Sequence, residues 1–193
     1  TDQLREAMNE VVHKFSQTNH PVELAPQPIA MDTFIDQAIG EITPLLTEKN
    51  IHLHLNLQEE LPEVYADRDA LQQIIIYLLQ NAAAATPENG MIGLKVRIDK
   101  SETDSLYMVL QVTDEGGGVP AEEIGKVFNR EYRSEHPQIQ GIMDAGTGLV
   151  VARTLVEAHN GRIWVECDTP NTSTYSVIFP LENQPKIGLH QLS

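Results

Sequence analysis

Cysteine and basic residues are scarce in this 193-residue sequence. The single cysteine, Cys167, excludes a disulfide within the chain and favours a reducing compartment. Only 13 Lys and Arg stand against 28 Asp and Glu, and the formal net charge of −15 makes nucleic acid and anionic membranes poor partners. No apolar run approaches membrane-spanning length and no signal peptide is visible. We therefore predict a cytoplasmic location, while the sequence leaves open whether a parent protein is anchored in a membrane.

The apolar content of 41% is enough for the core of one domain, and its spacing predicts both helices and strands. Helical spacing follows Asp32, a plausible N-cap, and Pro44 should bend this first helix. Further helices are predicted at 69–85, 121–128 and 147–159. Strand patterns cover 51–57, 91–98, 105–114, 162–167 and 173–180. Adjacent hairpin-like strands predict a mixed, mostly antiparallel sheet with helices on one face, which is an α+β two-layer sandwich.

The two ends of the chain read differently from this central part. Residues 1–19 carry one apolar helical stripe, and 21–30 contain three prolines and read as an extended linker. The stripe consists of Leu4, Met8, Val11, Val12 and Phe15. We predict a bundle helix at 1–20, a linker at 21–30, one domain at 31–182 and a tail at 183–193. The chain begins at Thr1 without an initiator Met, so we expect a piece of a longer protein.

Three features could carry chemistry. Asn81 lies in a mostly apolar helix, where its carbonyl oxygen suits Mg²⁺ or where it is simply an exposed or capping Asn. Asp114 ends a strand ahead of three glycines, which suits either a flat ring with an exocyclic amine or an ordinary Asp-Gly turn. Gly146-Thr147-Gly148 precedes a helix, and it is either an anion site or a hinge with a Thr N-cap. The long polar segment 129–146 before it has the length of a functional lid.

The order of these features resembles the GHKL (Bergerat) ATP-binding fold, and in detail the catalytic and ATP-binding domain of sensor histidine kinases. Five stretches carry this resemblance, which covers about residues 30–181. "LQQIIIYLLQNAAAATPENG" is similar to the asparagine box, "VTDEGGGVP" to the first glycine box, "VFNREYRS" to the phenylalanine box, "GTGLVVARTLVEAHNGRIWVE" to the second glycine box and "TSTYSVIFPL" to the last strand.

The resemblance implies ATP and Mg²⁺ as cofactors and assigns a role to each matching residue. Asn81 would ligate Mg²⁺, Asp114 would bind the adenine amine, and Thr174 would support the adenine. The remaining implied ATP contacts are Gly116, Gly118, Tyr132, Gly146, Thr147, Gly148 and Leu149. Residues 129–145 would form the ATP lid, with Arg130 and Arg133 as candidate phosphate contacts, each of which could equally be a solvated surface charge.

The implied activity is that of a protein-histidine kinase, a transferase in two-component signal transduction and phosphorelay. It would move the γ-phosphate of ATP to a histidine on a dimerisation domain. No acceptor histidine is evident in this sequence, so we expect it upstream of Thr1, in a protein that forms a homodimer. The implied partners are that dimerisation domain and the receiver domain of a response regulator, and no nucleic acid.

Four residues depart from the family pattern around the phosphates: Tyr77, Ala84, Glu131 and Val150. They keep a second interpretation open, a degenerate, non-catalytic GHKL module that senses nucleotide or dimerises. An anti-sigma-type serine kinase of the same fold fits less well, because residues 1–19 suit a helical bundle. A gyrase-like ATPase fits least, because Tyr77 stands in place of the acidic residue and no DNA-binding charge is present.

Overall fold

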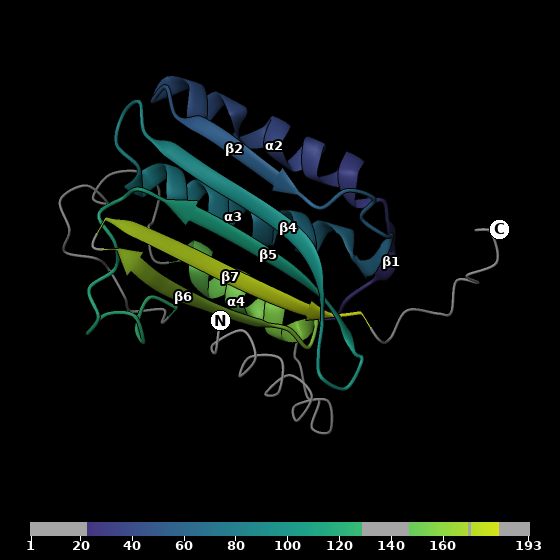
Figure 1. Ribbon diagram of the computed structural model, residues 1–193. Helices are drawn as coiled ribbons and strands as arrows, with labels where there is room; N and C mark the ends of the chain where they lie inside the picture. The colour runs from purple at the N-terminus through teal and green to yellow at the C-terminus, as the bar shows by residue number, and fades with distance from the viewer. Residues whose placement is uncertain (1–22, 129–146, 170, 182–193) are drawn as a thin grey trace.

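The computed structural model describes residues 23–128, 147–169 and 171–181. In this part of the chain a five-stranded sheet forms one layer and helices form the other (Figure 1). The sheet has the order β2-β4-β5-β7-β6. Its strands are β2 (His52–Leu57), β4 (Met91–Lys100), β5 (Leu106–Asp114), β6 (Arg162–Thr169) and β7 (Thr172–Pro180). The helices are α2 (Met31–Glu48), α3 (Arg68–Ala85) and α4 (Thr147–Ala158).

The strand pairing confirms the predicted fold class. β2 and β4 are parallel, and β4-β5, β5-β7 and β7-β6 are antiparallel. Alternate residues of the strands point to the helices and make the core with them. On β5 and β7 these core residues are Met108, Leu110, Val112, Tyr175, Val177 and Phe179. The sheet is therefore mixed and mostly antiparallel, with helices on one face.

A small second sheet lies where the chain enters the domain. β1 (Pro26–Ile29) pairs antiparallel with β3 (Val64–Asp67), although its segment was predicted to be a linker. Asp67 also caps α3, since its Oδ1 accepts the N–H of Ala70 at 2.9 Å, while its Oδ2 accepts the N–H of Ala25 at 2.8 Å. The extended conformation expected for 21–30 is thus present at 26–29, but as a paired strand. Both strands have four residues, and β1 contains two prolines, which explains why the sequence pattern did not reveal them.

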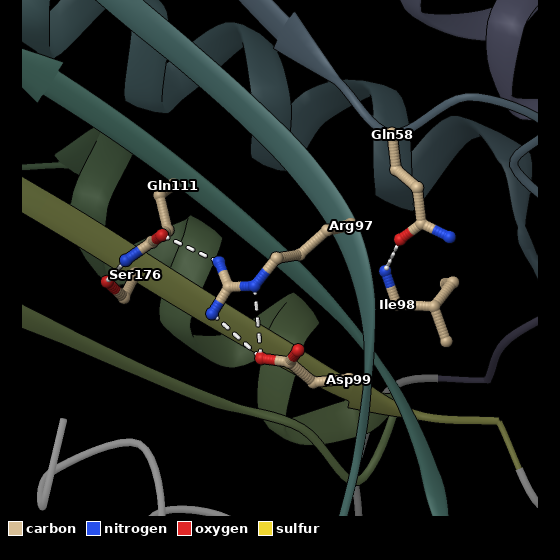
Figure 2. Close-up of polar contacts among 6 residues, drawn as sticks. All are labelled: Gln58, Arg97, Ile98, Asp99, Gln111 and Ser176. Atoms are coloured by element: carbon tan, nitrogen blue, oxygen red, sulfur yellow. Dashed lines mark hydrogen bonds and ion pairs between the residues drawn. The ribbon is translucent and has the colours of Figure 1, made fainter.

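The outer face of the large sheet, opposite the helices, carries a connected set of polar side chains (Figure 2). Arg97 of β4 bonds to Asp99 at 2.7 Å and donates from Nη1 to Gln111 of β5 at 2.9 Å. Gln111 in turn donates to the hydroxyl of Ser176 on β7 at 3.0 Å. At the sheet edge, Gln58 accepts the backbone N–H of Ile98 at 2.8 Å. This network ties β4, β5 and β7 together on the face away from the core.

Two local predictions were wrong. The N-cap of α2 is Ala30, without a side-chain hydrogen bond, and Asp32 lies in the first turn, where its charge still suits the helix dipole. Residues 121–128 form consecutive turns instead of a helix. α2 runs on through Pro44.

The predicted bundle helix at 1–20, the lid at 129–145 and the tail at 183–193 lie outside the described residues. No helix in the described part is long and apolar enough to cross a membrane.

Candidate nucleotide site

Asp114 is the last residue of β5, and its carboxyl group is buried. The residue is 1% exposed, and it lies on the core side of the sheet with Val112. Its Oδ1 accepts the N–H of Gly116 at 2.9 Å, whereas Oδ2 is buried without a hydrogen-bond partner among the described residues. Burial raises the pKa of Asp114 to about 6, against the smaller opposing effect of the Gly116 hydrogen bond. A buried carboxylate oxygen of this kind is costly unless something bonds to it.

Gly116 brings the loop after β5 directly against the end of α3. A Cβ at this position would lie 2.4 Å from the Cβ of Ala85 and 2.9 Å from its carbonyl carbon, so no side chain fits. Gly117 and Gly118 have φ values of +91° and +75°, a region that favours glycine. Gly117 N–H also donates to the carbonyl of Asn171 at 3.1 Å. We call Asp114, Gly116 and the C-terminal end of α3 the base end of the site.

Two side chains that were not predicted from the sequence form hydrogen bonds at or beside this base end. Lys49, just after α2, donates from Nζ to the carbonyl oxygens of Ala83 at 2.7 Å and Thr86 at 2.5 Å, with Ala84 at 3.3 Å. It therefore places a positive charge on the orphan carbonyls at the C-terminus of α3. The thiol of Cys167 on β6 accepts the N–H of Val119 at 3.2 Å, and it donates to the carbonyl oxygen of Val119 with a sulfur–oxygen distance of 3.4 Å. No local sequence pattern predicts these contacts, because Lys49 and Cys167 are each more than 30 residues from their partners in the sequence.

The other part of the site lies between α3 and α4, which pack against each other. Asn81 is half-buried on α3, and Tyr77 is one turn earlier on the same face. Gly148 and Leu149 lie in the first turn of α4, where Leu149 is buried and Gly148 lies against the Tyr77 ring. The first N–H groups of a helix have no partner within it and attract anions. We call Asn81, Tyr77 and the first turn of α4 the phosphate end.

Thr174 does not lie beside Asp114. It pairs with Thr113, and the two hydroxyl oxygens are 3.0 Å apart on the outer face of the sheet. Its neighbour Ser173 pairs with Asp114 on the core face and is 3% exposed. Ser173, and not Thr174, is therefore the β7 residue on the same face as Asp114, because strand residues alternate between faces and a slip of one residue changes the face.

The remaining implied contacts are only partly described. Phe128 packs in the core, with its ring edge-on to Tyr175 at a centroid distance of 6.3 Å. Arg130, Tyr132, Arg133 and Gly146 lie outside the described residues, and so does the side chain of Thr147. In the described ranges no three His, Cys, Asp or Glu side chains gather as a metal-binding group.

Ala84 and Val150, two of the departures from the family pattern, are compatible with the fold. Ala84 is 9% exposed near the end of α3, and its carbonyl faces Lys49. Val150 is half-buried within α4, and its carbonyl accepts the hydroxyl of Thr154 at 2.9 Å. Neither residue interrupts its helix.

Comparison with known proteins agrees with this geometry. The sequence model of the family described as histidine kinase-, DNA gyrase B- and HSP90-like ATPase matches residues 66–183. The adaptive-response sensory kinase SasA of Synechococcus sp. (strain CC9311) is 31% identical over 157 residues, which make up 81% of this chain and 39% of SasA. The solved catalytic domain of the histidine kinase ThkA, in a nucleotide-free form, has a TM-score of 0.69 at 25% identity, over 82% of this chain and 97% of that domain. Full-length ShkA in complex with AMPPNP has a TM-score of 0.70 at 23% identity, over 93% of this chain and 36% of ShkA.

This chain belongs to the family of histidine kinase-, DNA gyrase B- and HSP90-like ATPases. Its fold is that of the catalytic domains of sensor histidine kinases, as the resemblance of the sequence predicted.

Proposed function

We propose that this chain is the ATP-binding catalytic domain of a two-component sensor histidine kinase. The complete protein would transfer the γ-phosphate of ATP to a histidine on its dimerisation domain. The observation that carries the proposal is Asp114, whose Oδ2 is buried without a partner in the described part of the chain, beside the close approach of Gly116 to α3. An exocyclic amine is a donor that would satisfy this oxygen.

Each end of the site would hold one part of the nucleotide. At the base end, Asp114 would accept the adenine amine and Ser173 would lie beside it, in place of Thr174. At the phosphate end, Gly148, Leu149 and the N–H groups of the first turn of α4 would hold phosphate oxygens. Asn81 would offer one carbonyl oxygen to Mg²⁺, which prefers oxygen ligands and takes the others from phosphate and water.

Bound ATP would supply the phosphoryl group, and Mg²⁺ would neutralise the negative charge of the phosphates during the transfer. The residues of this chain would position the nucleotide and exclude water. The roles of Gly116, Gly118, Gly146 and Thr147 as backbone contacts, and of Arg130, Tyr132 and Arg133 as contacts from the lid, belong to the same proposal. No residue of this chain is assigned as a general base, because the acceptor histidine is itself the nucleophile.

The partners follow from the sensor-kinase relatives. The chain spans 39% of the length of SasA, so a histidine-bearing dimerisation domain and a homodimer belong to the proposed complete protein. A response regulator would receive the phosphoryl group from that histidine. The formal charge of −15 supports a protein partner over nucleic acid.

The test is calorimetric titration of this chain with AMPPNP, with and without Mg²⁺. We expect micromolar binding that needs Mg²⁺ and that Asp114→Asn weakens by roughly tenfold or more, the scale of a lost charge-assisted hydrogen bond. Asp104→Asn is the matched control, since it makes the same charge change in an exposed turn. Absence of binding at millimolar nucleotide would instead favour the degenerate, non-catalytic module.

A further inference from the structure

The ring of Tyr77 lies against Gly148. A Cβ built on Gly148 would be 3.3 Å from Cδ1, 3.5 Å from Cγ and 3.7 Å from Cβ of Tyr77. The first of these distances is tighter than ordinary van der Waals contact, so an added methyl group would push on the ring or on the helix. The glycine lets the backbone of α4 rest directly on the aromatic side chain of α3.

The position of this contact matters because it joins the two elements of the phosphate end. Tyr77 is half-buried one turn before Asn81 and belongs to the shell of side chains packed on the core. Gly148 is the second residue of α4, and the first N–H groups of a helix have no partner within it. The ring therefore determines how far the start of α4 lies from the face of α3 that carries Asn81.

We propose that Tyr77 is a positioning residue of the phosphate end: its ring holds the first turn of α4 and requires glycine at position 148. This inference rests on the proposed nucleotide-binding function. The side chain acts by its shape, through Gly148, and not as a proton acceptor. It gives a role to one of the four residues that depart from the family pattern.

The experiment is a double-mutant cycle at positions 77 and 148, measured as the affinity for Mg²⁺–AMPPNP and for adenosine. We expect Tyr77→Phe to bind like the parent chain, and Tyr77→Ala to lose roughly tenfold in Mg²⁺–AMPPNP affinity, because the first turn of α4 would lose the ring that it lies against. Adenosine affinity should change by less than about twofold in every variant, because the base end is a separate set of contacts. Gly148→Ala should weaken Mg²⁺–AMPPNP binding in the parent chain and have little effect in the Tyr77→Ala background.

The intrinsic preference of helices for Ala over Gly enters both backgrounds equally, so it cancels in the cycle. Tyr65→Ala, on the exposed side of β3, is the matched control and should leave both affinities unchanged. The proposal is overturned if the effects at 77 and 148 are additive, or if Tyr77→Phe is as damaging as Tyr77→Ala. If the parent chain binds no nucleotide, the proposed function fails. Thermal unfolding of the parent chain, Tyr77→Ala, Gly148→Ala and the double variant, without ligand, still decides whether the two positions are coupled.

Discussion

The base end and the phosphate end of the site are held by different kinds of contact. At the base end, the backbone of Gly116 lies so close to Ala85 that no side chain fits between them. Lys49 caps α3, and Asp114 is almost completely buried. At the phosphate end, the side chain of Tyr77 on α3 lies against Gly148 at the start of α4. A backbone contact tolerates little change, whereas a side-chain contact can be replaced by another of suitable shape. Tyr77 and Val150 both lie at or near the phosphate end, while Asp114 and Gly116 match the family pattern.

The strongest way to break this contrast is Gly116→Ala. Its methyl group would lie 2.4 Å from the Cβ of Ala85 and 2.8 Å from Oδ1 of Asp114, so the loop must move away from α3. We expect a loss of about 2–3 kcal/mol in the free energy of unfolding, and loss of adenosine binding. Gly125→Ala is the control, because nothing lies within 4 Å of its added Cβ. Chemical denaturation and calorimetry measure both, and equal stability of the two variants would contradict the backbone contact.

The charge of Asp114 gives the next largest effect. As pH falls, nucleotide affinity and the stability of the ligand-free chain should change in opposite directions. Because the pKa is raised to about 6, nucleotide binding through the carboxylate should weaken as pH falls below 6, by roughly tenfold per pH unit at most. The stability of the ligand-free chain should respond the other way. The folded state favours the protonated acid, so this contribution is complete below pH 3.8 and is lost as pH rises through about 6.

Asp114→Asn isolates that contribution, since an amide oxygen can still accept the N–H of Gly116. At pH 8 the ligand-free variant should be more stable than the parent by on the order of 2 kcal/mol, and the difference should vanish near pH 4. Denaturation curves at the two pH values measure it. A variant that is less stable than the parent at pH 8 would mean that the carboxylate has a stabilising partner.

Lys49→Met sharpens the comparison, because it removes the charged donor at the C-terminal end of α3. Three carbonyl oxygens would lose a charged donor, and we expect a loss of about 1–2 kcal/mol in stability. Lys49→Arg should recover part of it. Lys100→Met removes an equal charge from an exposed ion pair with Asp104 and should cost less than about 0.5 kcal/mol. Equal losses in Lys49→Met and Lys100→Met would exclude the capping role.

The smallest expected effect is that of Cys167→Ala, which removes the side chain that holds Val119 after the glycine loop. We expect about twofold weaker nucleotide binding and a stability loss below about 1 kcal/mol. Cys167→Ser keeps a donor and an acceptor and should lie closer to the parent chain. A larger loss in the Ser variant than in the Ala variant would show that packing, and not hydrogen bonding, determines the contact.

The long periodic elements were predictable from the sequence, and the short or face-dependent features were not. α3 and β5 appeared within about a residue of their observed ends, because their apolar spacing is long and regular. β1 and β3 escaped because a four-residue strand is stable only through its partner. The turns at 121–128 were mistaken for a helix, since a short polar stretch has too few apolar positions to establish a period.

The site shows the same limit. Asp114 and the glycines around it carry local signals, namely a strand end followed by small residues. The choice between Ser173 and Thr174 depends on the register of β7 against β5, which no local pattern contains. Lys49 acts across a distance of 34 residues in sequence, and so it becomes visible only when α2 and α3 are packed together.

The carboxylate of Asp67 links the chain at Ala25 to the start of α3, and this link has a mechanical consequence. The chain enters the domain at Ala25, whose N–H is held by the same carboxylate that caps α3, and β1 is then paired along its length with β3. We therefore expect a pull or twist on the chain before Ala25 to act on the first turn of α3. That helix is a stiff rod of 18 residues with Tyr77 and Asn81 along its length and Ala85 against Gly116 at its far end. We expect a force applied at Ala25 to reach both ends of the site through α3.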